Sequence, residues 1–157
     1  MILSKLAVVR VRAHGDVRKE VEDTLQFLRL TSPNHCTIIE DGSSQRGMLR
    51  KAKEMVTWGP IKPSVLGELL RERGEVSGDS SITDEKIKEF TSYATIEEFS
   101  EAVCEGDTDL SDLEDLKAVF RLHAPRKGYK SVRRQFAHGG ALGDRGEEIN
   151  DLLMRMI

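Results

Sequence analysis

The sequence has few cysteines, few aromatic residues and no long apolar run, and each shortage excludes a class of protein. Two cysteines in 157 residues cannot form a disulfide framework, so we expect a protein of the reducing cytoplasm. Aromatic residues, which commonly line small-molecule pockets, make up only 5% of the chain. No apolar stretch approaches the roughly 20 residues that cross a bilayer, and residues 1–5 do not begin a signal peptide. We therefore expect no membrane, no secretion and no small-molecule substrate.

Charged residues are abundant, at 32%, but they are unevenly distributed. Residues 1–74 carry 13 basic and 9 acidic side chains, residues 75–116 carry 2 and 14, and residues 117–157 carry 9 and 4. Within 121–146, seven basic residues accompany a single acid, Asp144. Because binding depends on the local field at one face, the net charge of −3 does not argue against a polyanionic partner. The distribution predicts two surfaces with different partners.

Hydrophobic periodicity predicts alternating strands and helices in the first domain, residues 1–74. Runs rich in β-branched residues predict strands at 6–12, 36–40 and 57–61. Apolar residues spaced by three and four predict helices at 17–28, 45–56 and 65–74. This order favours a layer of helices over one three-stranded sheet.

The remaining chain divides into an acidic insert, 75–116, and a C-terminal part, 117–157. In the insert, the capping box Thr95-x-x-Glu98 predicts one short helix whose acids face water. The C-terminal part begins with a predicted strand at 117–123. Residues 124–146, rich in glycine and basic residues, have no clear period, which predicts a long loop that becomes ordered on binding. A closing helix over 147–157 is expected to turn inward Ile149, Leu152, Leu153 and Met156.

Basic residues interleaved with Tyr129 and Phe136 are the strongest functional signal. Lysine and arginine neutralise phosphates, and an aromatic ring can stack on an unpaired base, so this stretch predicts RNA binding. A plain solvated loop also collects charge and is the alternative. The predicted contacts are Arg126, Lys127, Lys130, Arg133, Arg134, His138 and Arg145. A second patch is predicted on one face of the 45–56 helix, at Arg46, Arg50 and Lys53, although a solvent-exposed face is commonly basic as well.

The glycine cluster Gly139, Gly140 and Gly143 allows three interpretations. Backbone amides ahead of a helix can bind phosphate, which would suit a phosphate- or nucleotide-binding enzyme that uses residues 139–146. A turn that needs positive φ angles would also select glycine. The third interpretation is a loop that lies against an RNA backbone, where the missing side chains allow close approach.

No pattern predicts catalysis, a cofactor or a metal. The histidines and cysteines show none of the spacings of a zinc site. Cys36 falls in an apolar strand, where a buried, inert thiol is expected. No nucleophile elbow precedes a serine.

Several stretches resemble the L30 family of large-subunit ribosomal proteins. Residues 34–41 (NHCTIIED), 46–53 (RGMLRKAK) and 56–59 (VTWG) resemble the family's core, whereas 120–131 (FRLHAPRKGYKS) and 139–153 (GGALGDRGEEINDLL) resemble the long C-terminal region of its archaeal type. The resemblance implies an α+β fold with a ferredoxin-like βαβαβ core, helices on one face, and a helical, loop-rich extension. It also implies no catalysis, a cytoplasmic place in the large ribosomal subunit, and contacts with ribosomal RNA and neighbouring ribosomal proteins.

Overall fold

The computed structural model describes residues 4–13, 17–76, 80–113 and 116–157. Its centre is a six-stranded sheet with the order β6-β2-β1-β3-β8-β7. The three predicted strands lie together as β1 (Lys5–Arg10), β2 (His35–Glu40) and β3 (Val56–Pro60). β1 runs antiparallel to both neighbours, with Ala7 opposite Ile38 and Gly59. The first three predicted strands are confirmed to within two residues.

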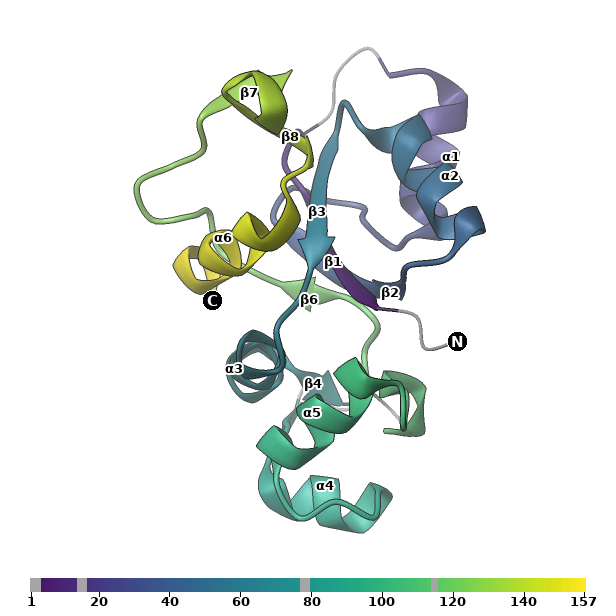
Figure 1. The fold of residues 1–157 in the computed structure, drawn as a ribbon, viewed down its shortest axis with the longest axis vertical. Coiled ribbons are helices and arrows are strands. Elements are labelled where there is room, and N and C mark those ends of the chain that lie inside the picture. Colours follow the sequence, from purple (N-terminus) through teal and green to yellow (C-terminus); the bar gives the residue numbers. More distant parts are fainter. Residues whose placement is uncertain (1–3, 14–16, 77–79, 114–115) are drawn as a thin grey trace.

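The two helices of the βαβαβ core lie on one face of the sheet, as the resemblance implied, whereas the third predicted helix and the C-terminal helix cover the other face (Figure 1). On one face, α1 (Lys19–Phe27) and α2 (Ser43–Ala52) pack over Leu6 and Val8. On the other, α3 (Pro63–Arg73) and α6 (Ile149–Met156) pack over Ala7 and Val9. Successive residues of a strand point to opposite faces, so the apolar run of β1 requires cover on both sides.

The sheet has six strands rather than three because the C-terminal part extends it at both edges. β6 (Phe120–Arg121) pairs antiparallel with β2, and it is much shorter than the predicted strand over 117–123. β8 (Gly140–Asp144) runs parallel to β3, and β7 (Ser131–Gln135) runs parallel to β8. The stretch predicted to be an irregular loop thus contains two strands, joined by a 3-10 turn at Phe136–His138.

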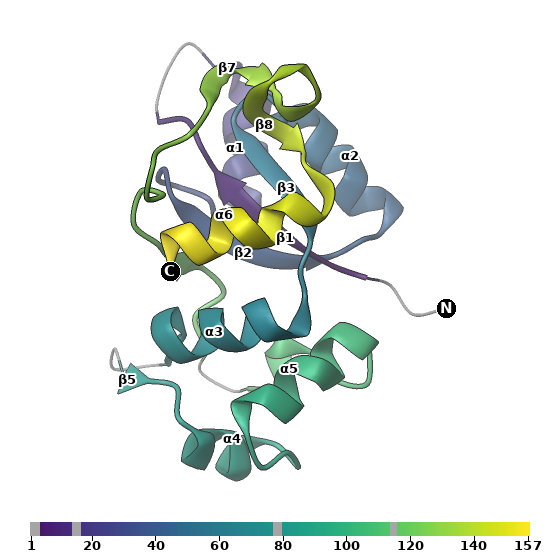
Figure 2. The same cartoon turned by 60° about the vertical axis from the view of Figure 1, so that its left-hand side comes forward.

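The acidic insert forms the lower part of the molecule in Figures 1 and 2. It contains a two-stranded ladder, β4 (Glu75–Val76) with β5 (Ser80–Ser81), then α4 (Asp84–Phe90), α5 (Ile96–Glu105) and a 3-10 turn at Leu110–Asp112. The predicted helix is α5, and the hydroxyl of Thr95 caps it by accepting from the Glu98 amide at 3.2 Å. α4 was not predicted.

The insert contributes to the hydrophobic core. α5 packs beside α3, and its residues Ile96, Phe99 and Val103 are fully buried. The acidic side chains of α5, Glu97, Glu98, Glu101 and Glu105, are exposed, as predicted.

At the C-terminus, the four predicted inward residues of α6 are all fully buried.

Candidate nucleic-acid interface

β7 carries two of the predicted RNA contacts on an exposed edge of the sheet. It is the last strand in the sheet order, and both Arg133 and Arg134 are exposed. Both arginines lie in the part of β7 between Ser131 and Gln135, where its pairing with β8 is irregular. His138 is exposed in the turn that follows. The strand and its turn therefore present three basic side chains to solvent.

The loop before β7 is held by the end of α6. Nη1 of Arg155 donates to the carbonyls of Arg126 and Gly128, at 3.2 and 3.1 Å. In return, Nη2 of Arg126 donates to the carbonyl of Met154 at 3.1 Å. Lys127 and Lys130 are exposed on this loop. The structure thus gathers the predicted loop residues at one end of α6, and it adds Arg155, which sequence reasoning did not select.

Arg145, although predicted to contact RNA, lies largely inside the protein, with 8% of its surface exposed. Its Nε donates to the hydroxyl of Thr57 at 2.8 Å, and its Nη2 donates to the carbonyl of Ala141 at 2.8 Å. The guanidinium lies 5.1 Å from the centre of the Phe136 ring. Burial, followed by the positive charge of Arg155, lowers the pKa of Arg145 below its ordinary value. Arg145 fastens β8 to β3 and differs in this respect from the exposed arginines of β7.

The three glycines fit the interpretation of a turn. Gly139 ends the 3-10 turn with φ +83°, and Gly143 has φ +80° within β8. A side chain on Gly140 would collide with the backbone carbonyl of Arg134, so close packing of β7 against β8 requires glycine there. β8 and a further 3-10 turn at Gly146–Glu148 separate these glycines from α6. They do not lie at a helix N-terminus, which removes the basis for a nucleotide enzyme.

Of the three residues predicted to form a patch on α2, one forms ion pairs with acidic residues and two are exposed. Nη2 of Arg46 donates to Asp41 at 2.8 Å, and its Nη1 lies 3.6 Å from Oδ2 of Asp144. The hydrogen bonds from Arg46 lower the pKa of Asp41. Arg50 and Lys53 remain exposed.

The two predicted basic patches lie side by side. Besides the contact between Arg46 and Asp144, Nε2 of Gln135 donates to the carbonyl of Lys53 at 3.2 Å, which joins the end of β7 to the end of α2. A cleft of about 320 Å³ between α1 and α2 is lined by four basic residues and two acidic ones, Glu20 and Glu54, and only two of the basic residues were predicted from the sequence. Its basic residues are Arg18, Arg50, Lys51 and Lys53. Lys51 lies between the predicted contacts Arg50 and Lys53 in the sequence, so its position could have indicated it as a further contact.

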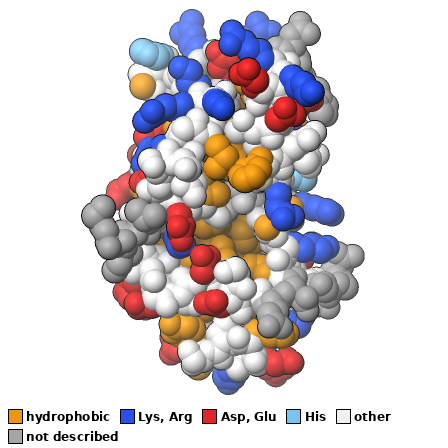
Figure 3. Space-filling model, turned by 90° about the vertical axis from the view of Figure 1, so that its right-hand side faces the viewer, with side chains coloured by type: hydrophobic (Ala, Val, Ile, Leu, Met, Phe, Trp, Pro, Cys, Tyr) orange, Lys and Arg blue, Asp and Glu red, His pale blue; other side chains and the backbone are white. Residues whose placement is uncertain are grey.

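Positive and negative charge are separated along the molecule. The acidic helices α4 and α5 lie at the opposite end from β7 and α2 (Figures 1 and 2). Figure 3 shows several basic side chains at the upper end of one face, with a smaller number of acidic ones among them. Within the described residues, the acids of 75–116 form ion pairs with Lys5, Arg71 and Lys117, none of which is a predicted RNA contact.

The described part of the chain contains no group of three or more His, Cys, Asp or Glu side chains that could hold a metal ion. Burial raises the pKa of the Cys36 thiol to about 12, so that thiol is not a nucleophile at neutral pH. None of the described helices is both long and apolar enough to span a bilayer.

Comparison with known proteins gives one consistent result. The sequence model of a family described as ribosomal protein L30p/L7e matches residues 6–56. Proteins named large ribosomal subunit protein uL30 are similar over nearly the whole chain. The one from Archaeoglobus fulgidus is 50% identical over 150 residues, which are 96% of this chain and 98% of the relative. The one from Methanopyrus kandleri is 47% identical over 149 residues, 94% of this chain and 100% of the relative.

Proposed function

The chain belongs to the ribosomal protein L30p/L7e family, and on this premise we propose how it binds in the large ribosomal subunit. It is a structural constituent of that subunit in the cytoplasm, it supports translation, and it is not an enzyme. Its partner is large-subunit ribosomal RNA. The continuous basic surface formed by β7, the preceding loop and α2 binds that RNA by charge and shape.

The observation that carries this proposal is the separation of charge between the two ends of the molecule. The exposed residues that we assign to RNA contact are Arg50, Lys53, Arg126, Lys127, Lys130, Arg133, Arg134 and His138. Of the three predicted glycines, Gly139 is the exposed one and has open space at its Cα, so RNA can approach it most closely. Arg46 and Arg145 are held by contacts within the protein, Arg46 by Asp41 and Asp144 and Arg145 by Thr57 and Ala141.

We also assign three units to the chain. Residues 1–74 form a ferredoxin-like RNA-binding core, residues 75–116 form a partly helical acidic insert, and residues 117–157 pack on the core. Support for the last unit comes from the pairing of β8 with β3, which makes the C-terminal part continuous with the central sheet.

The test is co-sedimentation of the chain with large ribosomal subunits depleted of this protein. The wild type should co-sediment at low salt and dissociate at high salt, because counterion release drives phosphate binding. Arg133→Ala/Arg134→Ala should bind weakly. The matched control, Arg73→Ala/Lys88→Ala, removes the same charge at the acidic end and should behave as the wild type. Equal binding of both double variants would contradict the assignment.

A second surface is proposed to dock a neighbouring ribosomal protein. A groove of about 380 Å³ lies between β2 and the segment that follows α5, and its apolar lining includes Ile38, Leu110 and Phe120. Figure 3 shows a hollow on this side, with hydrophobic side chains on its floor, acidic side chains along one border and basic side chains along the other. β6 pairs with β2 only at His35 and Cys36, so among the described residues no strand covers the edge beyond. An extended segment of a neighbouring protein fits the open edge and the apolar lining.

Deleting the insert would not test this docking, because α5 fills the core. A zero-length reagent that joins carboxylates to amines would instead link acids of 75–116 to lysines of a neighbouring protein in the assembled subunit. Neutralising the exposed acids Glu101 and Glu105 should remove links made through them while leaving RNA binding unchanged. A subunit in which the insert links to no protein would contradict the docking.

A further inference from the structure

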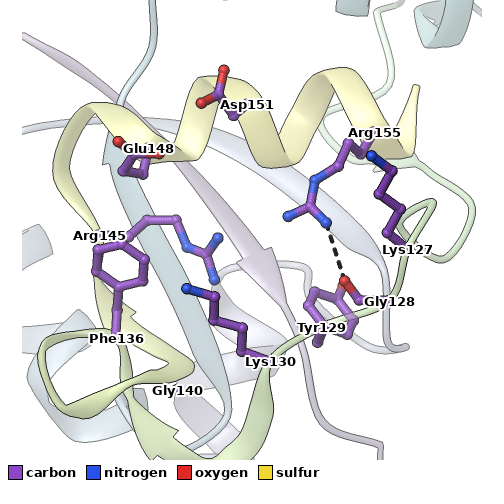
Figure 4. Close-up of a pocket in the computed structure, with 10 residues that line it drawn as sticks. All are labelled: Lys127, Gly128, Tyr129, Lys130, Phe136, Gly140, Arg145, Glu148, Asp151 and Arg155. Atoms are coloured by element: carbon purple, nitrogen blue, oxygen red, sulfur yellow. Dashed lines mark hydrogen bonds between the residues drawn. The ribbon is translucent and has the colours of Figure 1, made fainter.

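A cavity of about 510 Å³ lies between the 127–130 loop, the turn after β7 and α6 (Figure 4). This volume is within the range of pockets that enclose small ligands. Four basic side chains line it, from three different segments: Lys127, Lys130, Arg145 and Arg155. Two acidic residues, Glu148 and Asp151, also line it, and Figure 4 shows Asp151 pointing away from the two guanidinium groups.

The four basic side chains of this cavity outnumber its two acidic ones, and among the described residues none of the four forms an ion pair. Arg145 is more than nine-tenths buried, yet within the described ranges no carboxylate lies within ion-pair distance of it. The hydrogen-bond partners of Arg145 are uncharged oxygens of Thr57 and Ala141, and those of Arg155 are carbonyls. Glu148 acts on the pKa of Arg145 only from beyond ion-pair distance. Because a buried cation is costly, an anion bound in contact with the guanidinium would compensate it more fully.

The loop that supplies the lysines is fixed in place before any ligand binds. Lys127 has φ +69°, a left-handed conformation that residues other than glycine rarely adopt. The turn is closed by the Gly128 amide, which donates to the Pro125 carbonyl at 2.9 Å, and by the two hydrogen bonds from Arg155. Such strain persists where the surroundings over-determine it, which is common at binding sites.

Aromatic side chains extend the cavity's chemistry beyond phosphate. Phe136 and Tyr129 both line it and are partly exposed. The hydroxyl of Tyr129 donates to Oδ1 of Asn34 at 2.7 Å, so this ring is held in place. Phe136 has no polar group. The Arg145 guanidinium lies over its ring, 5.1 Å from the centre, so a base would stack on the part of the ring that remains exposed.

We propose that this cavity is a binding site for one unstacked nucleotide of single-stranded RNA. Its phosphate contacts Lys130 and the buried Arg145, and its base lies against the Phe136 ring. This inference rests on the proposed function, and it adds a defined ligand to a surface otherwise described only by charge.

In the experiment, the full chain is titrated with a single-stranded RNA hexanucleotide. Chemical-shift changes in the nuclear magnetic resonance spectrum show where the RNA binds, and the titration gives its affinity. The wild type should show its largest shifts at Lys130, Phe136 and Arg155. Phe136→Leu, which keeps an apolar side chain, should lose affinity about tenfold without changing the salt dependence. Lys130→Gln should weaken binding and also flatten the salt dependence. Phe27→Leu, on an exposed ring of α1, is the matched control.

The outcomes separate the cavity from the general surface. If the wild type binds ribosomal RNA with strong salt dependence but Phe136→Leu and Lys130→Gln match it, the nucleotide site is overturned while the proposed function stands. If the wild type shows no salt-dependent RNA binding, the proposed function itself fails. Adenosine monophosphate is the second probe, and binding as tight as that of the hexanucleotide would overturn an RNA site in favour of a small-molecule site.

Discussion

Nη1 of Arg46 on α2 lies 3.6 Å from Oδ2 of Asp144 at the end of β8. The two residues are far apart in the sequence, and their contact holds the basic residues of α2 beside those of β7. Both side chains are partly exposed, so we expect the ion pair to contribute less than about 1 kcal/mol to stability. Its main consequence is electrostatic, because Asp144 is the single acid among the basic residues of 121–146.

Asp144→Asn should therefore tighten RNA binding, and more strongly at low salt than at high salt. The asparagine oxygen can still accept the hydrogen bond from the Gly146 amide, so the fold should change little. Glu101→Gln changes the net charge equally within the acidic insert and should leave affinity unchanged. Binding titrations at two salt concentrations measure both effects. Equal effects of the two variants would show that position does not matter and would contradict the account.

Arg145→Ala should destabilise the protein by about 2 to 4 kcal/mol, because it leaves buried acceptors on Thr57 and Ala141 without a donor. Arg133→Ala, at an exposed position of β7, should change stability by no more than about 0.5 kcal/mol. Urea unfolding compares the two variants. A stable Arg145→Ala protein would mean that this guanidinium does not fasten β8 to β3.

Gly140→Ala should disrupt the pairing of β7 with β8, since the new methyl group would collide with the carbonyl of Arg134. We expect a loss of about 2 kcal/mol or more, together with faster amide exchange in β8. Gly139→Asn is the control, because open space surrounds that position and asparagine tolerates a positive φ. Similar stabilities of the two variants would argue against close packing at Gly140.

Stability should fall as the solution is acidified through the ordinary pKa of histidine. Burial, followed by the positive charges of Arg121 and Arg10, lowers the pKa of His35 from 6.5. Between the two pKa values the unfolded chain binds the proton and the folded chain does not, so unfolding becomes easier as the pH decreases. His35→Asn should show a smaller loss of stability from about pH 7 to about pH 5. An unchanged pH profile would exclude His35 as its source.

The core elements could be predicted from local pattern alone. The apolar residues of α6 recur at helical spacing, and all four predicted positions are buried. β1 also follows directly from its apolar, β-branched run. The expectation of helices on one face holds for α1 and α2 of the βαβαβ core but not for α3, which packs on the other face.

β7 and β8 could not be predicted because contacts with distant parts of the chain, rather than their own sequences, stabilise them. β8 contains two glycines, which have low strand propensity, and it forms by pairing with β3. The hydroxyl of Thr57 on β3 donates to the carbonyl of Gly143 at 2.8 Å, a contact between distant parts of the chain. No local pattern shows it.

The candidate interface was predictable in composition but not in arrangement. The sequence places Arg145 among exposed basic residues with nothing to distinguish it, yet Thr57 and Phe136 draw it inside. Likewise, the sequence does not predict the hydrogen bond between Gln135 and the carbonyl of Lys53. That α2 and β7 lie side by side is therefore known only from the fold.

The most direct test of the account is the salt dependence of affinity for large-subunit RNA, compared between the wild type and Arg133→Ala/Arg134→Ala. If both guanidinium groups contact phosphate, the slope of log affinity against log salt should flatten by roughly 1.4 to 1.8 units. A double variant with the wild-type slope would contradict the placement of RNA on β7.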